Sequence, residues 1–178
     1  MIIVNYSNIN KLITDNSYSS VFLLLDNNTE KHCLDLFIKK SGIVNFNKVV
    51  VNDGEESKSI DTCKDVWEYL NTNNADRKSL LINIGGGVVT DLGGFIASTY
   101  LRGIDFINVP TTLLAQVDAS IGGKTAVNHK SGKNLIGSFY QPQCVICDSI
   151  FLATLEATEI SAGLAEIIKY GLIFDSEF

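Results

Sequence analysis

Hydrophobic and polar positions alternate between two patterns along the chain. Short, continuous apolar runs, typical of strands buried on both faces, cover residues 21–25, 44–51, 80–84, 106–109 and 144–147. Apolar residues three and four positions apart, typical of amphipathic helices, lie between these runs in residues 29–40, 57–70 and 88–101. Strands that alternate with helices form parallel βαβ units, so the pattern predicts an α/β fold with a Rossmann-like parallel sheet.

The pattern changes near Ile150, which divides the chain into two parts. Residues after Thr154 have helical periodicity, with Ile160, Leu164 and Ile168 on one face, and no later element covers that face before the sequence ends. We therefore expect an α/β domain over residues 1–150. We expect residues 151–178 to be the first helix of a truncated helical domain whose remainder is absent.

Composition narrows the class of protein. Hydrophobic residues make up 46% of the 178 residues and charged residues 19%, which is enough apolar material for a packed core. Lys and Arg number 14 against 20 Asp and Glu, whereas a general nucleic-acid binder needs an excess of positive charge. The apolar runs are shorter than the roughly 18 residues that a membrane span requires, and residues 1–6 lack the basic segment of a signal peptide. We expect a cytoplasmic protein with reduced cysteines and no nucleic-acid or membrane partner.

Three consecutive glycines, Gly85, Gly86 and Gly87, join a predicted buried strand to a predicted helix. Glycines at such a junction let backbone N–H groups approach a phosphate closely, and the helix N-terminus adds partial positive charge. The pyrophosphate of a dinucleotide would fit there. The spacing differs from the usual G-x-G-x-x-G fingerprint, however, and a tight strand-to-helix turn explains the glycines equally well.

A second glycine-spaced stretch, residues 118–134, is rich in polar residues. The sequence Gly122-Gly123-Lys124-Thr125 differs from a nucleotide-triphosphatase loop because Asp118 stands where that loop requires a glycine. Lysines combined with Asp and Asn side chains suit a polyhydroxylated anionic substrate, although a solvated loop explains any single lysine. The polar residues expected to converge are Asp118, Lys124, Lys133 and Asn134.

The remaining candidate ligands do not form a metal motif. Cys144 and Cys147 have C-x-x-C spacing, but they lie in a strand-like apolar run, so we interpret them as core cysteines. His32 and His129 are isolated from one another in the sequence. Two charged residues on the last predicted helix, Glu166 and Lys169, are three positions apart, and their simplest interpretation is a surface ion pair.

Several blocks, taken together, resemble the 3-dehydroquinate synthase family in order and spacing. They are residues 85–91, 100–103, 109–114, 117–125, 132–142 and 163–171, and the resemblance covers most of the chain from Asp53 onward. It implies a phosphate-eliminating lyase of the shikimate pathway, which leads to chorismate and the aromatic amino acids. The substrate would be DAHP, a phosphorylated seven-carbon sugar acid, and the product 3-dehydroquinate. The family uses catalytic NAD and a divalent metal, Zn2+ or Co2+.

The resemblance also implies which residues hold the NAD. The adenosine ribose would be held by Asp53, Gly54, Glu55, Glu56, Ser57 and Lys58, assisted by Asp26 and Asn28. The pyrophosphate would lie on Gly86, Gly87 and Val88, with Val89, Thr90 and Asp91 following toward the nicotinamide. The adenine side would be lined by Thr111, Thr112, Phe151, Leu152, Ala153 and Thr154, and the nicotinamide would face Lys124 and Lys133.

By the same resemblance, the substrate would contact Asp118, Lys124, Asn134 and Lys169. Arg102 would reach into the site of a neighbouring subunit, which implies a homodimer. Glu166 matches the carboxylate ligand of the metal, whose two histidine ligands have no counterpart before Phe178, so we expect the isolated chain to be inactive. Three alternatives remain open: another sugar phosphate cyclase, a metal-dependent polyol dehydrogenase, or an NAD-binding module without turnover.

Overall fold

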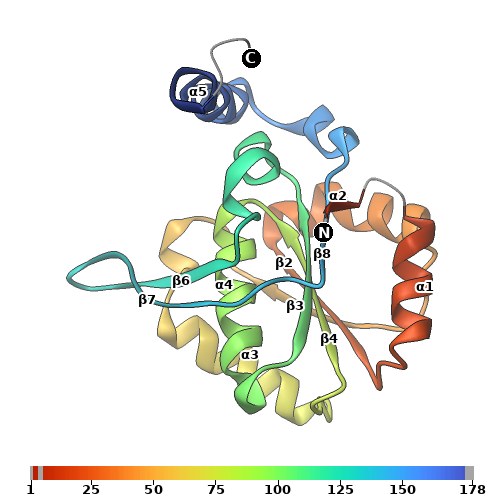
Figure 1. The fold of residues 1–178 in the computed structure, drawn as a ribbon. Coiled ribbons are helices and arrows are strands. Elements are labelled where there is room, and N and C mark those ends of the chain that lie inside the picture. Colours follow the sequence, from red (N-terminus) through yellow and green to blue (C-terminus); the bar gives the residue numbers. More distant parts are fainter. Residues whose placement is uncertain (1, 4–5, 175–178) are drawn as a thin grey trace.

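The computed structural model describes residues 2–3 and 6–174, which form a parallel sheet covered by helices on both faces (Figure 1). The six strands are all parallel to their neighbours. In spatial order they are β1 (Ile2–Ile3), β8 (Cys144–Ile146), β5 (Asp105–Pro110), β4 (Leu80–Gly85), β2 (Val21–Asp26) and β3 (Asn47–Val51). The predicted Rossmann-like α/β fold is confirmed.

Each face of the sheet has its own hydrophobic core, because successive side chains of a strand point to opposite faces. On one face, Leu23 and Ile82 pack with residues of α1 (Ser7–Asp15) and α2 (Asn27–Ser41). On the other, Leu24 and Leu81 pack with residues of α3 (Ile60–Thr72) and α4 (Gly87–Thr99). Both faces of the central strands are therefore buried, which explains their uninterrupted apolar sequence.

A two-stranded antiparallel hairpin lies outside the sheet, against α4 (Figure 1). It consists of β6 (Lys124–His129) and β7 (Gly132–Phe139). Thr125 and Val127 of β6 are buried while the residues between and beside them are more exposed. The sequence analysis described this region as a polar, glycine-spaced stretch and did not predict the hairpin. Buried and exposed residues alternate along β6, as in a strand with one buried face. The neighbouring glycines and charged residues made this alternation hard to recognise in the sequence.

The structure differs from the sequence-based prediction at two other places. α1 was not predicted, although Ile9, Leu12 and Ile13 have helical spacing, because the segment is short and has only these three apolar residues. The predicted helix over residues 57–70 is divided: the 3₁₀ turn η1 (Glu55–Ser57) comes first, and α3 begins only after Ser59. The Ser59 side chain accepts a hydrogen bond from the Thr62 N–H at 3.2 Å and so caps α3.

The remaining elements connect the sheet to the last helix. They are the 3₁₀ turn η2 (Tyr100–Arg102), the π-helical turn η3 (Ala115–Ala119), the 3₁₀ turn η4 (Ser149–Thr154) and the helix α5 (Ala157–Phe174). α5 stands away from the sheet and touches η3 (Figure 1). Among the described helices there is none with the length and apolar content needed to cross a membrane.

Candidate functional site

Two cavities open at the carboxyl edge of the sheet, where ligands bind in doubly wound folds. The first cavity lies where the neighbouring strands β2 and β4 end. After β2 the chain continues into α2 on one face of the sheet, whereas after β4 it continues into α4 on the opposite face. This reversal is a topological switch point, which opens a crevice between the strand ends. The cavity measures about 750 Å³ and we call it the glycine cavity. Its lining includes Asp26, Asn28, Asp53, Gly54, Glu55, Lys58, Gly86, Gly87, Val88, Asp91, Thr111, Thr112, Lys133, Asn134, Phe151 and Thr154.

The glycines of this cavity form the entrance to α4. β4 ends at Gly85, Gly86 is the N-cap, and α4 begins at Gly87. A Cβ atom at Gly86 would lie 2.9 Å from Thr112 Cγ2, so the backbone here is packed too closely for a side chain. The Thr90 hydroxyl donates back to the carbonyl oxygens of Gly86 and Gly87, each at 3.2 Å, and so leaves the amides of the first turn uncovered. A cradle of backbone N–H groups at a helix N-terminus fits the phosphates of a dinucleotide.

The carboxyl end of β2 supplies acidic and amide groups to the same cavity. Asp26 accepts a hydrogen bond from the Thr29 N–H at 2.7 Å and caps α2. Asn28 donates to Asp53 at 3.2 Å, which ties this end of β2 to the segment after β3. Carboxylates and amides at this position are suited to the hydroxyl groups of a ribose.

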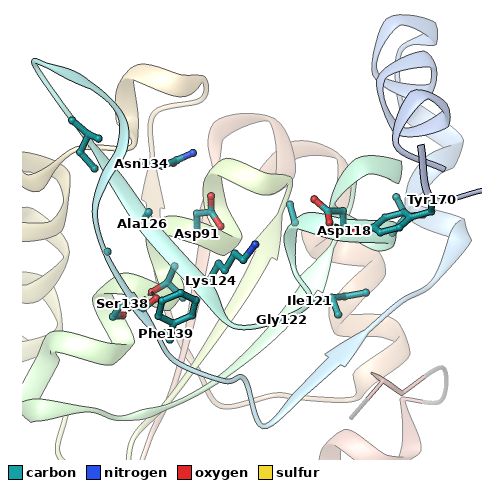
Figure 2. Close-up of a pocket in the computed structure, with 15 residues that line it drawn as sticks. Asp91, Asp118, Ile121, Gly122, Lys124, Ala126, Asn134, Ser138, Phe139 and Tyr170 are labelled. Carbon is teal, nitrogen blue, oxygen red and sulfur yellow. Dashed lines mark hydrogen bonds between the residues drawn. The ribbon is translucent and has the colours of Figure 1, made fainter. Parts of the chain in front are cut away.

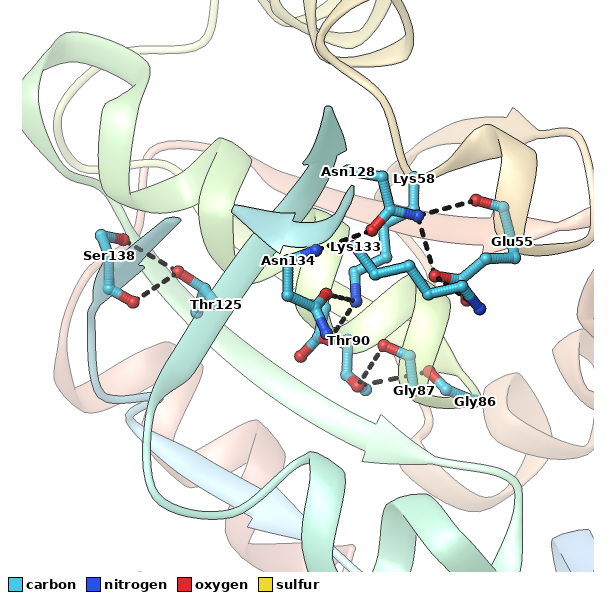
Figure 3. A network of polar contacts seen from close by, with 11 residues as sticks. Glu55, Lys58, Gly86, Gly87, Thr90, Thr125, Asn128, Lys133, Asn134 and Ser138 are labelled. Carbon is cyan, nitrogen blue, oxygen red and sulfur yellow. Dashed lines mark hydrogen bonds and ion pairs between the residues drawn. The ribbon is translucent and has the colours of Figure 1, made fainter. Parts of the chain in front are cut away.

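A buried charged pair lies between the glycine cavity and the hairpin (Figure 3). The Lys58 side chain is only 4% exposed, and its Nζ lies 2.5 Å from Asp91 Oδ2 and donates to Asn134 Oδ1. Burial raises the pKa of the Asp91 carboxyl, Lys58 acts in the opposite direction, and the neighbouring Glu55 and Asp118 raise it further. Lys58 therefore compensates only in part for surroundings that disfavour the charge of this carboxylate, and the pKa of Asp91 stays above its ordinary value.

The second cavity, of about 830 Å³, lies between η3, the hairpin and α5 (Figure 2), and we call it the hairpin cavity. Asp118, Lys124 and Asn134 line it, as does Asp91, so Asp91 and Asn134 belong to both cavities. The Tyr170 hydroxyl donates to Asp118 Oδ1, and this bond, more than burial, raises the tyrosine pKa. The cavity thus combines a lysine with carboxylate, amide and hydroxyl groups, which can bind a polar anionic molecule.

The structure leaves several of the predicted residues outside both cavities. Arg102 is exposed at the opposite end of α4 from the glycines. Glu56 and Ser57 line a separate hollow beside β3, and Val89 and Thr90 are buried.

Lys169 forms an ion pair with Glu166, which agrees with the simpler interpretation of these two residues. Neither residue lines the hairpin cavity. Leu152 and Ala153 likewise lie outside the lining of the glycine cavity.

Several lining residues were missed by the sequence analysis, among them Tyr170 and His32. Tyr170 follows the predicted Lys169 directly, and this proximity was the available signal. His32 lines the glycine cavity from α2, but a single histidine on a helix gives no such signal.

The described residues do not provide a complete metal site. Within residues 2–3 and 6–174, no group of three or more His, Cys, Asp and Glu side chains could hold an ion. Glu166, the expected metal ligand, is paired with Lys169. Cys144 is buried in β8, and burial raises its pKa to about 11, as expected of a core cysteine, while Cys147 is half-buried just beyond the strand. A metal ion therefore does not fit this part of the chain by itself.

The fold and the two cavities define an α/β domain of the doubly wound class, with a glycine loop at the entrance to α4. The family model described as "3-dehydroquinate synthase N-terminal" matches residues 48–162. The chain accordingly belongs to the 3-dehydroquinate synthase family, as the sequence blocks indicate.

Individual relatives agree with this assignment. The 3-dehydroquinate synthase of Campylobacter jejuni subsp. doylei is 50% identical over 157 residues, which are 88% of this chain and 45% of that protein. The chain thus spans about half the length of the curated relatives it matches.

Two solved structures show the same architecture. One is 2-epi-5-epi-valiolone synthase from Streptomyces hygroscopicus with NAD+ and Zn2+ bound; it is 29% identical with a TM-score of 0.87, over 99% of this chain and 50% of that one. The other is 2-deoxy-scyllo-inosose synthase complexed with carbaglucose-6-phosphate, NAD+ and Co2+. It is 28% identical with a TM-score of 0.86, over 94% of this chain and 46% of that one.

Proposed function

We propose that this chain is the NAD-binding part of a 3-dehydroquinate synthase, which converts DAHP to 3-dehydroquinate and phosphate. The main support for the proposal is that the two cavities share Asp91 and Asn134 in their linings. The chain also belongs to this family. A site that both oxidises its substrate transiently and eliminates phosphate needs a dinucleotide and a sugar acid side by side. Two solved neighbours were crystallised with NAD+, which supports the same cofactor here.

In the glycine cavity, the first-turn amides of α4 would bind the pyrophosphate of NAD+. Asp26 and Asp53, at the ends of neighbouring strands, would accept hydrogen bonds from ribose hydroxyls. NAD+ supplies a hydride acceptor at the substrate's C5 hydroxyl, and the resulting ketone makes the C6 proton acidic so that phosphate can leave. Asp91 and Asn134 lie where this cavity meets the next, so they would adjoin the nicotinamide.

In the hairpin cavity, Lys124 would bind an anionic group of the substrate, and Asp118 and Asn134 would orient its hydroxyl groups. Lys124 also offsets negative charge that develops on the substrate during elimination. Tyr170 holds Asp118 through its hydroxyl, which keeps the carboxylate directed at the cavity.

The metal, Zn2+ or Co2+, and the dimer belong to the proposal as well. Glu166 would be one metal ligand, and since the described residues supply no group of three or more ligands, no step is assigned to the metal. Arg102, which lies away from both cavities of its own chain, would serve the site of a partner subunit in a homodimer. We further propose the division at residue 150 and a cytoplasmic location.

Titration calorimetry with NAD+ tests the glycine cavity. The 178-residue chain should bind NAD+ in preference to ATP, and G86D should abolish binding by placing a carboxylate against the pyrophosphate. N71D adds the same charge at an exposed position of α3 and should bind normally. Preferential ATP binding, or NAD+ binding that survives G86D, would contradict the proposal.

Phosphate release from DAHP separates an enzyme from an NAD-binding module. We expect the 178-residue chain to bind NAD+ without releasing phosphate, because a catalytic metal requires about three protein ligands and the described residues offer no group of three. Joined to the C-terminal half of a relative, it should release phosphate and form 3-dehydroquinate. A joined protein that binds NAD+ but acts only on a non-acidic sugar phosphate would instead indicate another sugar phosphate cyclase.

A further inference from the structure

The hairpin contains an irregularity that carries two of the residues discussed above. Val127 pairs with Ile136, and His129 pairs with Gly132. Between these two pairs β6 has only Asn128, whereas β7 has residues 133–135, so β7 bulges outward. Lys133 and Asn134 therefore owe their direction to a bulge rather than to regular strand pairing.

The bulge requires an unusual backbone. Asn134 has a φ of 57°, in the left-handed region that few residues other than glycine adopt readily. Such a conformation persists when neighbouring groups hold it in place. The Asn134 N–H, which has no regular strand partner at the bulge, donates instead to the Asn128 side-chain oxygen at 2.9 Å.

The other end of the same amide reaches the loop after β3. Asn128 Nδ2 donates to Glu55 Oε1 at 2.8 Å, and the Asn128 backbone N–H donates to the Lys58 carbonyl oxygen at 2.8 Å (Figure 3). Lys133 Nζ lies 3.8 Å from the same Glu55 carboxylate. Asn128 thus joins the bulge to η1, although it lines neither cavity itself.

We propose that Asn128 is a positioning residue, whose side chain fixes the bulge and ties it to Glu55. It thereby holds the Asn134 and Glu55 side chains in the positions from which they would contact a ligand. The identity of the ligand, NAD+, rests on the proposed function, but the positioning role does not. The Asn128 amide accepts from the Asn134 N–H with its oxygen while its nitrogen donates to the Glu55 carboxylate, which a carboxylate at this position could not do.

Two substitutions at position 128 distinguish the contact with the Asn134 N–H from the contact with the Glu55 carboxylate. N128D keeps an oxygen for the Asn134 N–H but places a carboxylate against that of Glu55, so the two groups repel each other. The double variant N128D/E55Q reverses the bond, because the side-chain amide introduced by E55Q can donate to the new carboxylate at position 128. N128A removes both contacts.

Calorimetry with NAD+ and amide hydrogen exchange at Asn134 provide the test. N128D should weaken NAD+ binding about tenfold, since one hydrogen bond to a charged group is lost. N128D/E55Q should bind as E55Q alone does, a rescue that general destabilisation would not produce. Asn134 exchange should accelerate in N128A but not in N128D, and N71D should match the wild type in both measurements.

Each outcome has a definite meaning. Unchanged NAD+ affinity in N128D, or a double variant no better than N128D, overturns the proposal. Unchanged Asn134 exchange in N128A overturns it without reference to any ligand. If N128A does not fold, the comparison of N128D with N128D/E55Q decides. If the wild-type chain binds no NAD+, the proposed function fails, and the exchange measurement alone tests the role of Asn128.

Discussion

Gly86 shows how the absence of one side chain shapes the glycine cavity. Its Cβ would lie 2.9 Å from Thr112 Cγ2, closer than such atoms ordinarily approach. We expect G86A to displace Thr112 and to lower the free energy of unfolding by about 1–2 kcal/mol, the usual effect of overpacking. T112S removes the methyl group but keeps the hydroxyl that accepts from the Ala115 N–H, so G86A/T112S should recover most of this loss.

Urea denaturation of these variants measures the effect. G87A is the matched control, because a Cβ at Gly87 would meet Ala119 Cβ at 3.4 Å, an ordinary contact distance, and should change stability little. Equal losses in G86A and G87A, or no recovery in G86A/T112S, would contradict the packing argument.

At the scale of elements, Asp148 connects the start of η4 to α2. Its side chain lies 2.7 Å from Lys40 Nζ and accepts from the Ile150 N–H at 3.0 Å. Partial burial by itself would raise the pKa of Asp148, but Lys40 and the Ile150 N–H outweigh it and hold the pKa below 3.8. The folded state therefore binds this proton less readily than the unfolded chain does.

The sign of the pH dependence follows from this lowered pKa. The contribution of Asp148 should be complete above about pH 4 and should be lost as the pH falls through its lowered value. D148N keeps the cap but loses the charge, so it should cost about 1 kcal/mol at about pH 7, a modest value for a partly exposed pair, and much less in acid below the lowered pKa of Asp148. Urea titrations at both pH values check this, with D65N on the exposed side of α3 as control. A cost of D148N that persists at low pH would show that the charge is not responsible.

At the scale of the whole molecule, stability is concentrated in the two cores beside the sheet. β4 is buried along its full length, whereas Ile168, Leu172 and Phe174 of α5 are 60%, 83% and 75% exposed. We expect the amides of α5 to exchange with solvent much faster than those of β4, because protection follows local packing. Hydrogen exchange followed by mass spectrometry, on the chain without ligand, measures the exchange rates of α5 and β4.

A variant at Gly163 tests what holds α5. A Cβ there would lie 2.5 Å from Leu113 Cγ, so G163A should loosen α5 from the segment before η3 and accelerate its exchange further, with β4 unchanged. The neighbouring A162S is exposed and should behave as the wild type. Similar protection of α5 and β4 in the wild type would mean that α5 belongs to the same cooperative unit as the sheet.

The sequence by itself determined the class of fold, because a strand buried on both faces must be apolar throughout, as Leu80–Gly85 is. It also determined the loop at Gly86, since a strand that enters a helix through glycines leaves few alternatives. The family followed from blocks of residues whose combined spacing is far more specific than any one motif. These are local properties, in which the residues that matter are neighbours in the chain.

Tertiary structure decided which of these distant groups make direct contact with one another. Lys58 meets Asp91 across 33 positions and Asn134 across 76, and Tyr170 meets Asp118 across 52. Asn128 has no sequence signal, because its role arises only where the bulge of β7 comes close to Glu55. Hydrogen bonds and ion pairs act over a few ångströms, so separation along the chain does not predict them. They depend on the fold, which places the carboxyl ends of the strands, the hairpin and α5 near one another.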